Sequence, residues 1–182
     1  MRAGWLGALC VLAACASAAP AEGQGRARTM GDLLAEEPDS DWRAIAPENL
    51  LIMDLAHGGR VIIELAPTFA PNHVANVRAL ARARYWDNSP IARSQENYVV
   101  QWNRDEGDAT PRGQAAQSLP AEFERRAAGL EITTLRDPDS YAGMVGFADG
   151  FPVAGEGDLA WLAHCYGMVG AGRGDGADSG SG

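Results

Sequence analysis

Two runs of mainly apolar residues, with a glycine pair between them, predict a β-hairpin. The runs are Leu50–Leu55 and Arg60–Leu65, and Gly58 and Gly59 stand between them. Glycines in a short link between two β-rich runs are typical of a hairpin turn. In the second run every other residue from Val61 onward is apolar, which predicts that one face of this strand is buried.

A helix is predicted next, from Asn72 to about Arg84. Pro71 suits its first turn, because proline has no N–H and the first helical N–H groups have no partner inside the helix. Apolar side chains recur at three- and four-residue steps and make one face of this helix: Val74, Val77, Leu80 and Ala81. The polar side chains, among them that of Asn76, are expected to lie mainly off this face.

The remaining short apolar runs predict a mostly β domain with this one clear helix. Strands are expected at residues 91–93, 98–102, 130–135, 143–148 and 161–169. A polar loop from Asn103 to about Leu119 separates the second of these strands from the third. Ahead of the domain, which is expected to begin at Asn49, short helical turns are predicted at residues 32–34 and 42–45.

The first residues have the pattern of a secretory signal peptide, here assigned to residues 1–14. Arg2 precedes an apolar run of about ten residues, half of the roughly 20 that a membrane-spanning helix needs. The stretch ending in Ala14-Cys15 resembles a bacterial lipobox, which predicts cleavage before Cys15 and lipidation of its thiol. The alternative is ordinary cleavage after the A-x-A site Ala16–Ala18. Residues 15–48 are then a tether and an N-terminal extension.

Composition narrows the functions that this chain can have. All 15 basic residues are arginine, so chemistry that depends on a lysine is excluded. The formal net charge of −9 disfavours binding to nucleic acid and to anionic lipid surfaces. A lipid anchor is therefore the only membrane contact that we expect. The three histidines have no spacing typical of metal ligands, and we expect neither a metal nor a cofactor.

The order of hairpin, helix, arginine-bearing strand and glutamine-bearing strand resembles that of the cyclophilin-type peptidyl-prolyl isomerases. The resemblance runs from about Leu50 to Ala148. Arg60–Pro67 and Ala70–Leu80 are similar to the family's opening strand and first helix. The fold that this resemblance implies is an antiparallel β-barrel with a capping helix.

The resemblance also implies an active site. Arg93 is followed after five residues by Tyr98 and after three more by Gln101, which are the family's spacings. These three residues correspond to its catalytic arginine, its pocket aromatic residue and its substrate-orienting glutamine. Tyr98 and Val99 are expected to form an apolar floor for the proline ring. Two residues in a later stretch correspond to the lining of the peptide groove: Ala148 and Asp149.

Several positions depart from the family pattern. Ala92 replaces the histidine that precedes the arginine, and Trp102–Asp105 replaces a glycine-glycine-aspartate sequence. Residues 150–177 have no clear counterpart and are interpreted as an insertion. Asp178–Gly182 resembles the start of a later strand, and the sequence ends there. We therefore expect a truncated domain over residues 49–182, whose barrel is incomplete because the last strands and the second helix are missing.

The function that the resemblance implies is peptidyl-prolyl cis–trans isomerisation, and the predicted signal peptide makes exported proteins the expected substrates. Rotation about an X–Pro bond needs no nucleophile and no metal, and the substrates are expected to be proline-containing polypeptides. We expect a monomer in the periplasm, anchored to the membrane as a lipoprotein, or a soluble secreted protein if cleavage follows Ala18. Two other functions stay open: a proline-peptide-binding envelope lipoprotein without catalysis, and a non-functional fragment.

Overall fold

The structure is a computed structural model that describes residues 26–105 and 107–180. The chain divides into two units, Met1–Arg43 and Ala44–Gly182, which are described separately below. The predicted signal peptide, Cys15 and the A-x-A site lie outside the described residues. The predicted domain boundaries stay predictions.

The first unit contains helix α1, Met30–Glu36, followed by a single 3-10 turn, Asp39–Asp41. Helix α1 begins with a capping box: the backbone N–H of Asp32 donates to Oγ1 of Thr29 at 3.2 Å, and the N–H of Thr29 donates to Oδ2 of Asp32 at 2.8 Å. The predicted turn at residues 32–34 is therefore confirmed. The turn predicted at residues 42–45 is wrong, because the chain from Trp42 onward is extended.

The second unit opens with the predicted hairpin. After a 3-10 turn at Pro47–Asn49, strand β1, Leu50–Asp54, pairs antiparallel with strand β2, Arg60–Glu64. Gly58 has φ +89°, a left-handed conformation that favours glycine and lets the chain reverse.

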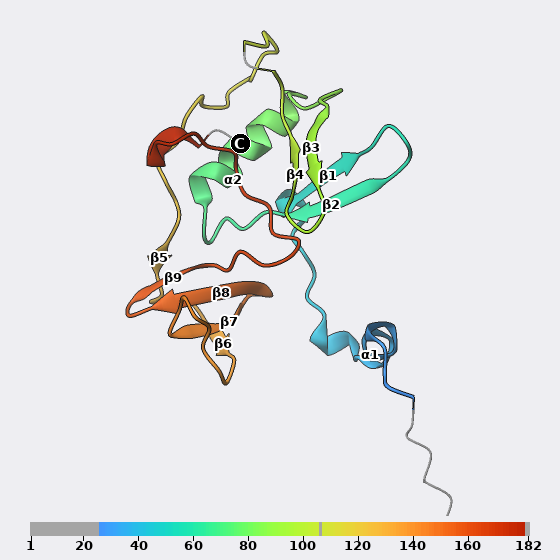
Figure 1. Ribbon diagram of the computed structural model, residues 1–182, viewed down its shortest axis with the longest axis vertical. Helices are drawn as coiled ribbons and strands as arrows, with labels where there is room; N and C mark the ends of the chain where they lie inside the picture. The colour runs from blue at the N-terminus through green and yellow to red at the C-terminus, as the bar shows by residue number, and fades with distance from the viewer. Residues whose placement is uncertain (1–25, 106, 181–182) are drawn as a thin grey trace, which may run out of the picture. The chain divides into compact units, whose positions relative to one another are not determined.

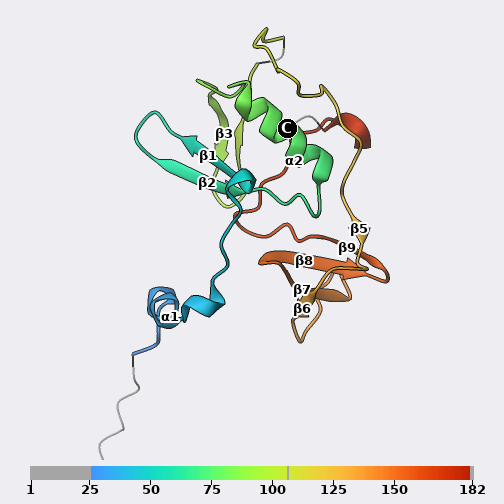
Figure 2. The ribbon, with the colours of Figure 1, turned by 180° about the vertical axis from the view of Figure 1, so that it is seen from behind.

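Helix α2, Pro71–Arg82, lies beside both two-stranded hairpins in Figures 1 and 2. Val74 and Leu80 are buried as predicted, but Asn76, expected off the buried face, is only 6% exposed. Its side-chain oxygen accepts from the backbone N–H of Ala116 at 2.7 Å, and its amide donates to the carbonyl of Ala116 at 3.3 Å. The prediction was wrong because the backbone of a distant loop satisfies this buried amide.

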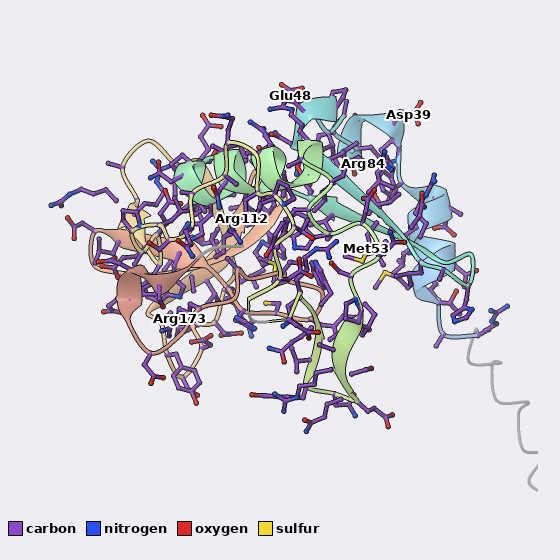
Figure 3. The ribbon with its side chains drawn as sticks, turned by 90° about the horizontal axis from the view of Figure 1, so that it is seen from above. Asp39, Glu48, Met53, Arg84, Arg112 and Arg173 are labelled. Carbon is purple, nitrogen blue, oxygen red and sulfur yellow. The ribbon has the colours of Figure 1, made fainter. Side chains whose placement is uncertain are left out.

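Two hydrophobic clusters form the core of the second unit. The first joins the hairpin to helix α2, and its members are Ile63, Leu65 and Val74 with the partly buried Leu51, Met53, Val77 and Trp102. Met53 is labelled in Figure 3. The second cluster lies between the segment after β2 and the largest sheet, and its buried members are Ala66, Phe69, Ala148 and Val153. The segment 65–69 therefore contributes to both clusters.

The other strands form two more antiparallel sheets. Strands β3, Ile91–Gln95, and β4, Val99–Trp102, were predicted as strands, and the structure pairs them in a second hairpin. A five-stranded sheet has the order β5-β9-β8-β7-β6. Its strands are β5, Arg125–Arg126; β6, Ile132–Thr134; β7, Met144–Ala148; β8, Phe151–Glu156; and β9, Leu159–Leu162.

The sequence interpretation of the C-terminal third needs correction. Strand β8 was not predicted, and it lies with β9 inside the segment interpreted as an insertion. The strand predicted at residues 161–169 is wrong for most of its length, because β9 ends at Leu162 and a turn with Gly167 at φ +82° follows. A 3-10 turn, Ala177–Ser179, comes later.

The mostly β character and the antiparallel pairing are confirmed. Over residues 26–105 and 107–180 the strands form three separate sheets, and no closed barrel is present. Two α-helices occur in these residues, and neither is long and apolar enough to cross a bilayer.

Candidate active site

The second hairpin carries three of the predicted site residues. Strands β3 and β4 are joined by a turn at residues 96–98, in which Asn97 has φ +54°, a conformation that asparagine tolerates. The pairing register places Arg93 directly opposite Gln101. The register shifts between Ile91 and Arg93, so that Ala92 is an extra residue at a bulge. Bulges bend a strand and redirect its side chains, and this one adjoins the arginine.

Two contacts hold the guanidinium of Arg93. Nη2 donates a hydrogen bond to Oε1 of Gln95 at 2.7 Å. Cζ lies 5.0 Å from the ring centroid of Tyr98, within the range of a cation–π interaction. Tyr98 as a whole remains 71% exposed. Arg93 and Tyr98 therefore share one solvent-facing surface, on which the guanidinium stacks on the tyrosine.

Gln101 and Val99 belong to the same hairpin. Because Arg93 pairs with Gln101 and Gln95 pairs with Val99, these four side chains share one face of the two strands. The next residue, Trp102, packs against the cluster between the first hairpin and helix α2. Strand β4 is thus anchored to the core one residue beyond Gln101.

The two residues expected to line the groove lie on the five-stranded sheet instead. Ala148 ends β7, is 3% exposed and packs in the cluster that contains Phe69 and Val153. Asp149 and Gly150, with φ +48° and +78°, make the turn between β7 and β8. The structure therefore does not place these two side chains on the hairpin of Arg93, and their contact with substrate stays a prediction.

Two cavities in the described part of the chain are lined by other residues. A cavity of about 70 Å³ lies beside Phe69, Phe123 and Trp161. A more open one of about 430 Å³ lies beside Tyr85 and Arg112, the second of which is labelled in Figure 3. Neither of these two cavities is lined by Arg93, Tyr98 or Gln101.

The larger cavity borders a stacked cluster that sequence reasoning missed. The Tyr85 ring lies 5.6 Å from Cζ of Arg104 and 4.8 Å from Cζ of Arg112. Arg104 also donates to the carbonyls of Tyr85 and Asp87 and, at 3.2 Å, to Oδ2 of Asp108. These contacts order part of the polar loop against the end of helix α2. An arginine in a polar loop carries no local signal of such a contact.

A second arrangement missed from the sequence caps helix α2. Ala70, at the N-cap position, makes no side-chain cap, and Glu122 supplies the acceptors instead. Its Oε1 accepts from the backbone N–H of Asn72 at 3.0 Å, and its Oε2 accepts from that of His73 at 2.9 Å. Nδ1 of His73 lies 2.7 Å from the same Oε2 and carries the proton, because an ionised carboxylate only accepts.

The environment of Glu122 determines how its charge depends on pH. Burial by itself raises the pKa of this carboxyl, but hydrogen bonds from the backbone of Asn72 and His73 and from the His73 side chain outweigh it. The net effect is a pKa below the ordinary value of 4.5. Because the folded state holds the ionised form, this contribution to stability is present above pH 4.5 and is lost as the pH falls through the lowered pKa.

We expect Glu122→Gln to lower the free energy of unfolding at pH 7 by about 1.5–3 kcal/mol, because it weakens hydrogen bonds to a charged group. The difference from the wild type should shrink as the pH falls below about 4.5, since the amide does not titrate. Urea denaturation followed by circular dichroism at pH 7 and pH 3.5 measures both effects. Glu124→Gln, an exposed carboxylate on the same segment, is the control. Equal losses at the two pH values would contradict the assigned role.

Comparison with known proteins identifies the family. Residues 51–181 match the family described as cyclophilin type peptidyl-prolyl cis-trans isomerase/CLD. The chain belongs to the cyclophilin-type peptidyl-prolyl cis–trans isomerases. A search of the curated proteins found no match to this cyclophilin.

Family membership confirms the main expectations from the sequence. The mostly β structure with antiparallel sheets is consistent with a cyclophilin-like fold. The activity is peptidyl-prolyl cis–trans isomerisation, and the substrates are proline-containing polypeptides. The match also includes residues 150–177, the segment that the sequence interpretation set apart. Among the described residues of this cyclophilin, no cluster of histidine, cysteine and carboxylate side chains could hold a metal ion.

Proposed function

We propose that this cyclophilin isomerises X–Pro bonds of exported proteins by non-covalent catalysis, with Arg93 as the catalytic residue. The observation that supports this most directly is that Arg93, Tyr98 and Gln101 lie together on one hairpin, with Arg93 opposite Gln101. The test is to compare isomerase turnover of the full chain with that of its Arg93→Ala variant on a proline-containing peptide.

The proposed chemistry follows from the barrier to rotation. A trans-to-cis change passes through a twisted amide about 18–20 kcal/mol above the ground state, where conjugation between nitrogen and carbonyl is lost. The nitrogen lone pair is then localised and can accept a hydrogen bond, as can the prolyl carbonyl oxygen. The guanidinium of Arg93 has several planar N–H donors and keeps its charge throughout. Donors that bind the twisted state better than the planar one lower the barrier, and no bond to the substrate forms.

The neighbouring residues take the binding roles in this proposal. The side chains of Tyr98 and Val99 contact the proline ring, and the amide of Gln101 holds the substrate backbone. Gln101 shares a strand face with Arg93, so one bound peptide can reach both. Ala148 and Asp149 are proposed to contact a flanking part of the substrate. For Ala148 this contact requires its surroundings to open, because it is 3% exposed.

One observation favours a second candidate function, proline-peptide binding without turnover. Arg93 and Tyr98 are exposed, and neither of the two cavities described above is lined by them. An exposed surface excludes less water from a bound amide than an enclosed slot does, and electrostatic stabilisation is weaker in water. Peptide-dependent chemical-shift changes without faster cis–trans exchange would favour this second function over the first.

We also propose that the chain is exported to the periplasm and is held at the membrane there by a lipid on Cys15. The support is the sequence alone: an apolar leader that ends in Ala14-Cys15. In a bacterial host, radioactive palmitate should label the wild-type chain and not the Cys15→Ser variant, because the variant lacks the thiol to which the lipid is attached. A mature N-terminus at Ala19 in the wild type would contradict the anchor and favour a soluble secreted protein.

A further inference from the structure

A glutamine outside the proposed mechanism holds the guanidinium of Arg93. Gln95 follows Arg93 by two residues in strand β3, so both side chains lie on the same face. Oε1 of Gln95 accepts the hydrogen bond from Nη2 of Arg93 at 2.7 Å, which is the length of a well-formed N–H···O bond. The Tyr98 ring contacts the guanidinium as well, with Cζ 5.0 Å from the centroid. Two different side chains therefore fix the orientation of this group.

The two glutamines on this face of the hairpin have different surroundings. Gln101 is the cross-strand partner of Arg93, yet within residues 26–105 and 107–180 its side chain makes no hydrogen bond. Gln95 lies nearer the turn, where it pairs with Val99. Its side chain is the one that contacts the guanidinium. The amide of Gln101 is thus available to a substrate, whereas the oxygen of Gln95 is occupied by Arg93.

We propose that Gln95 is a positioning residue for the isomerase reaction. Its side-chain oxygen accepts a hydrogen bond from one N–H of Arg93, and the stacking on Tyr98 sets the plane of the guanidinium. Together these contacts orient the remaining N–H donors of Arg93 toward the X–Pro amide. Without such contacts, the side chain of an exposed arginine populates many rotamers. N–H donors that must first be ordered during the reaction stabilise the transition state less than donors that are already in place. This inference rests on the proposed role of Arg93 in catalysis.

The test uses the full chain and three variants of strand β3. Gln95→Met keeps the length of the side chain without an amide oxygen, and we expect kcat to fall by about threefold to tenfold with little change in KM. Gln95→Glu keeps an acceptor oxygen and should restore most of the lost turnover. Ser94→Ala, on the opposite face of the strand, should match the wild type. NMR exchange of a proline peptide over a range of peptide concentrations gives kcat and KM.

Two further measurements separate positioning from a merely structural role. In an Arg93→Ala background, Gln95→Met should cause no further loss, because its partner is gone. Relaxation of the Arg93 Nε–H signal should show greater mobility in Gln95→Met than in the wild type. Wild-type kcat or unchanged Arg93 mobility in Gln95→Met would overturn the inference, as would an equal loss in both backgrounds. Wild-type turnover of Arg93→Ala itself would overturn the proposed mechanism instead.

Discussion

Replacing Arg93 with alanine is expected to lower the turnover of X–Pro bonds by more than tenfold and to leave the fold intact. A tenfold loss corresponds to about 1.4 kcal/mol of transition-state stabilisation, which a charged hydrogen bond to the twisted amide readily exceeds. The fold should persist because Arg93 is exposed and its contacts, to Gln95 and Tyr98, are local to the hairpin. NMR exchange on a proline peptide measures turnover, and circular dichroism monitors the fold.

The matched control for this variant is Arg136→Ala. The Arg136 side chain is 90% exposed, and its ion pair is with the adjacent Asp137. It lies outside the hairpin, so its loss should leave turnover within experimental error of the wild type. Equal activity of the wild type and the Arg93→Ala variant would remove Arg93 from the mechanism. It would leave the family assignment, which rests on the match over residues 51–181, unaffected.

The largest expected effect on stability comes from Leu80→Ala. Leu80 lies on helix α2 and is completely buried, with 0% exposure. Truncating a buried leucine removes its transfer free energy and leaves a cavity, at a usual cost of about 2–5 kcal/mol. Because domains of this size are stable by only about 5–15 kcal/mol, this loss is a large share of the total. Urea denaturation should show a lower midpoint with an unchanged slope.

Leu34→Ala provides a control with the same change of side chain. Leu34 lies on helix α1 and is 49% exposed, so little apolar surface returns to water and no cavity forms. We expect this variant to change the free energy of unfolding by about 0.5 kcal/mol or less. Similar losses in the two variants would show that Leu80 is not in a close-packed core.

Local sequence signals predicted the first hairpin and helix α2 closely. The apolar runs on either side of Gly58 became β1 and β2, and Pro71 became the first residue of the helix. Both elements depend mainly on residues near one another in the chain: a glycine that allows a positive φ, and a proline that suits the first helical turn. The first hairpin and helix α2 could therefore be predicted from their own residues, without knowledge of the rest of the fold.

Strand β8 shows where local signals fail. It contains Pro152 and Gly155, which are both depleted in strands, yet Val153 between them is 1% exposed at the centre of the sheet. Pairing with β7 on one side and β9 on the other stabilises the strand despite its composition. The adjacent error at residues 161–169 has the same origin. Val153 is the partner of Leu162, and the N–H of Ala163 still donates to the carbonyl of Pro152. Because β8 begins at Phe151, it offers no partner to the rest of the predicted strand.

The roles of the candidate site residues stay predictions, and the sequence did not predict the contacts that they make. The spacing of Arg93, Tyr98 and Gln101 indicated the family's site, and the turn at residues 96–98 places the arginine opposite the glutamine. The spacing did not indicate that Gln95 accepts the hydrogen bond from Arg93. That contact depends on side-chain rotamers, which the order of residues along a strand leaves open.

The sequence by itself determined the mostly β character, the first hairpin, the helix and the family. Only the tertiary structure decided that Glu122 caps helix α2, that Asn76 binds the backbone of Ala116 and that Ala148 is buried. The two hydrogen-bonded contacts join residues that are 50 and 40 positions apart in the chain. A local pattern fixes backbone conformation and one buried face, whereas the partner of a buried polar group depends on how distant segments pack together.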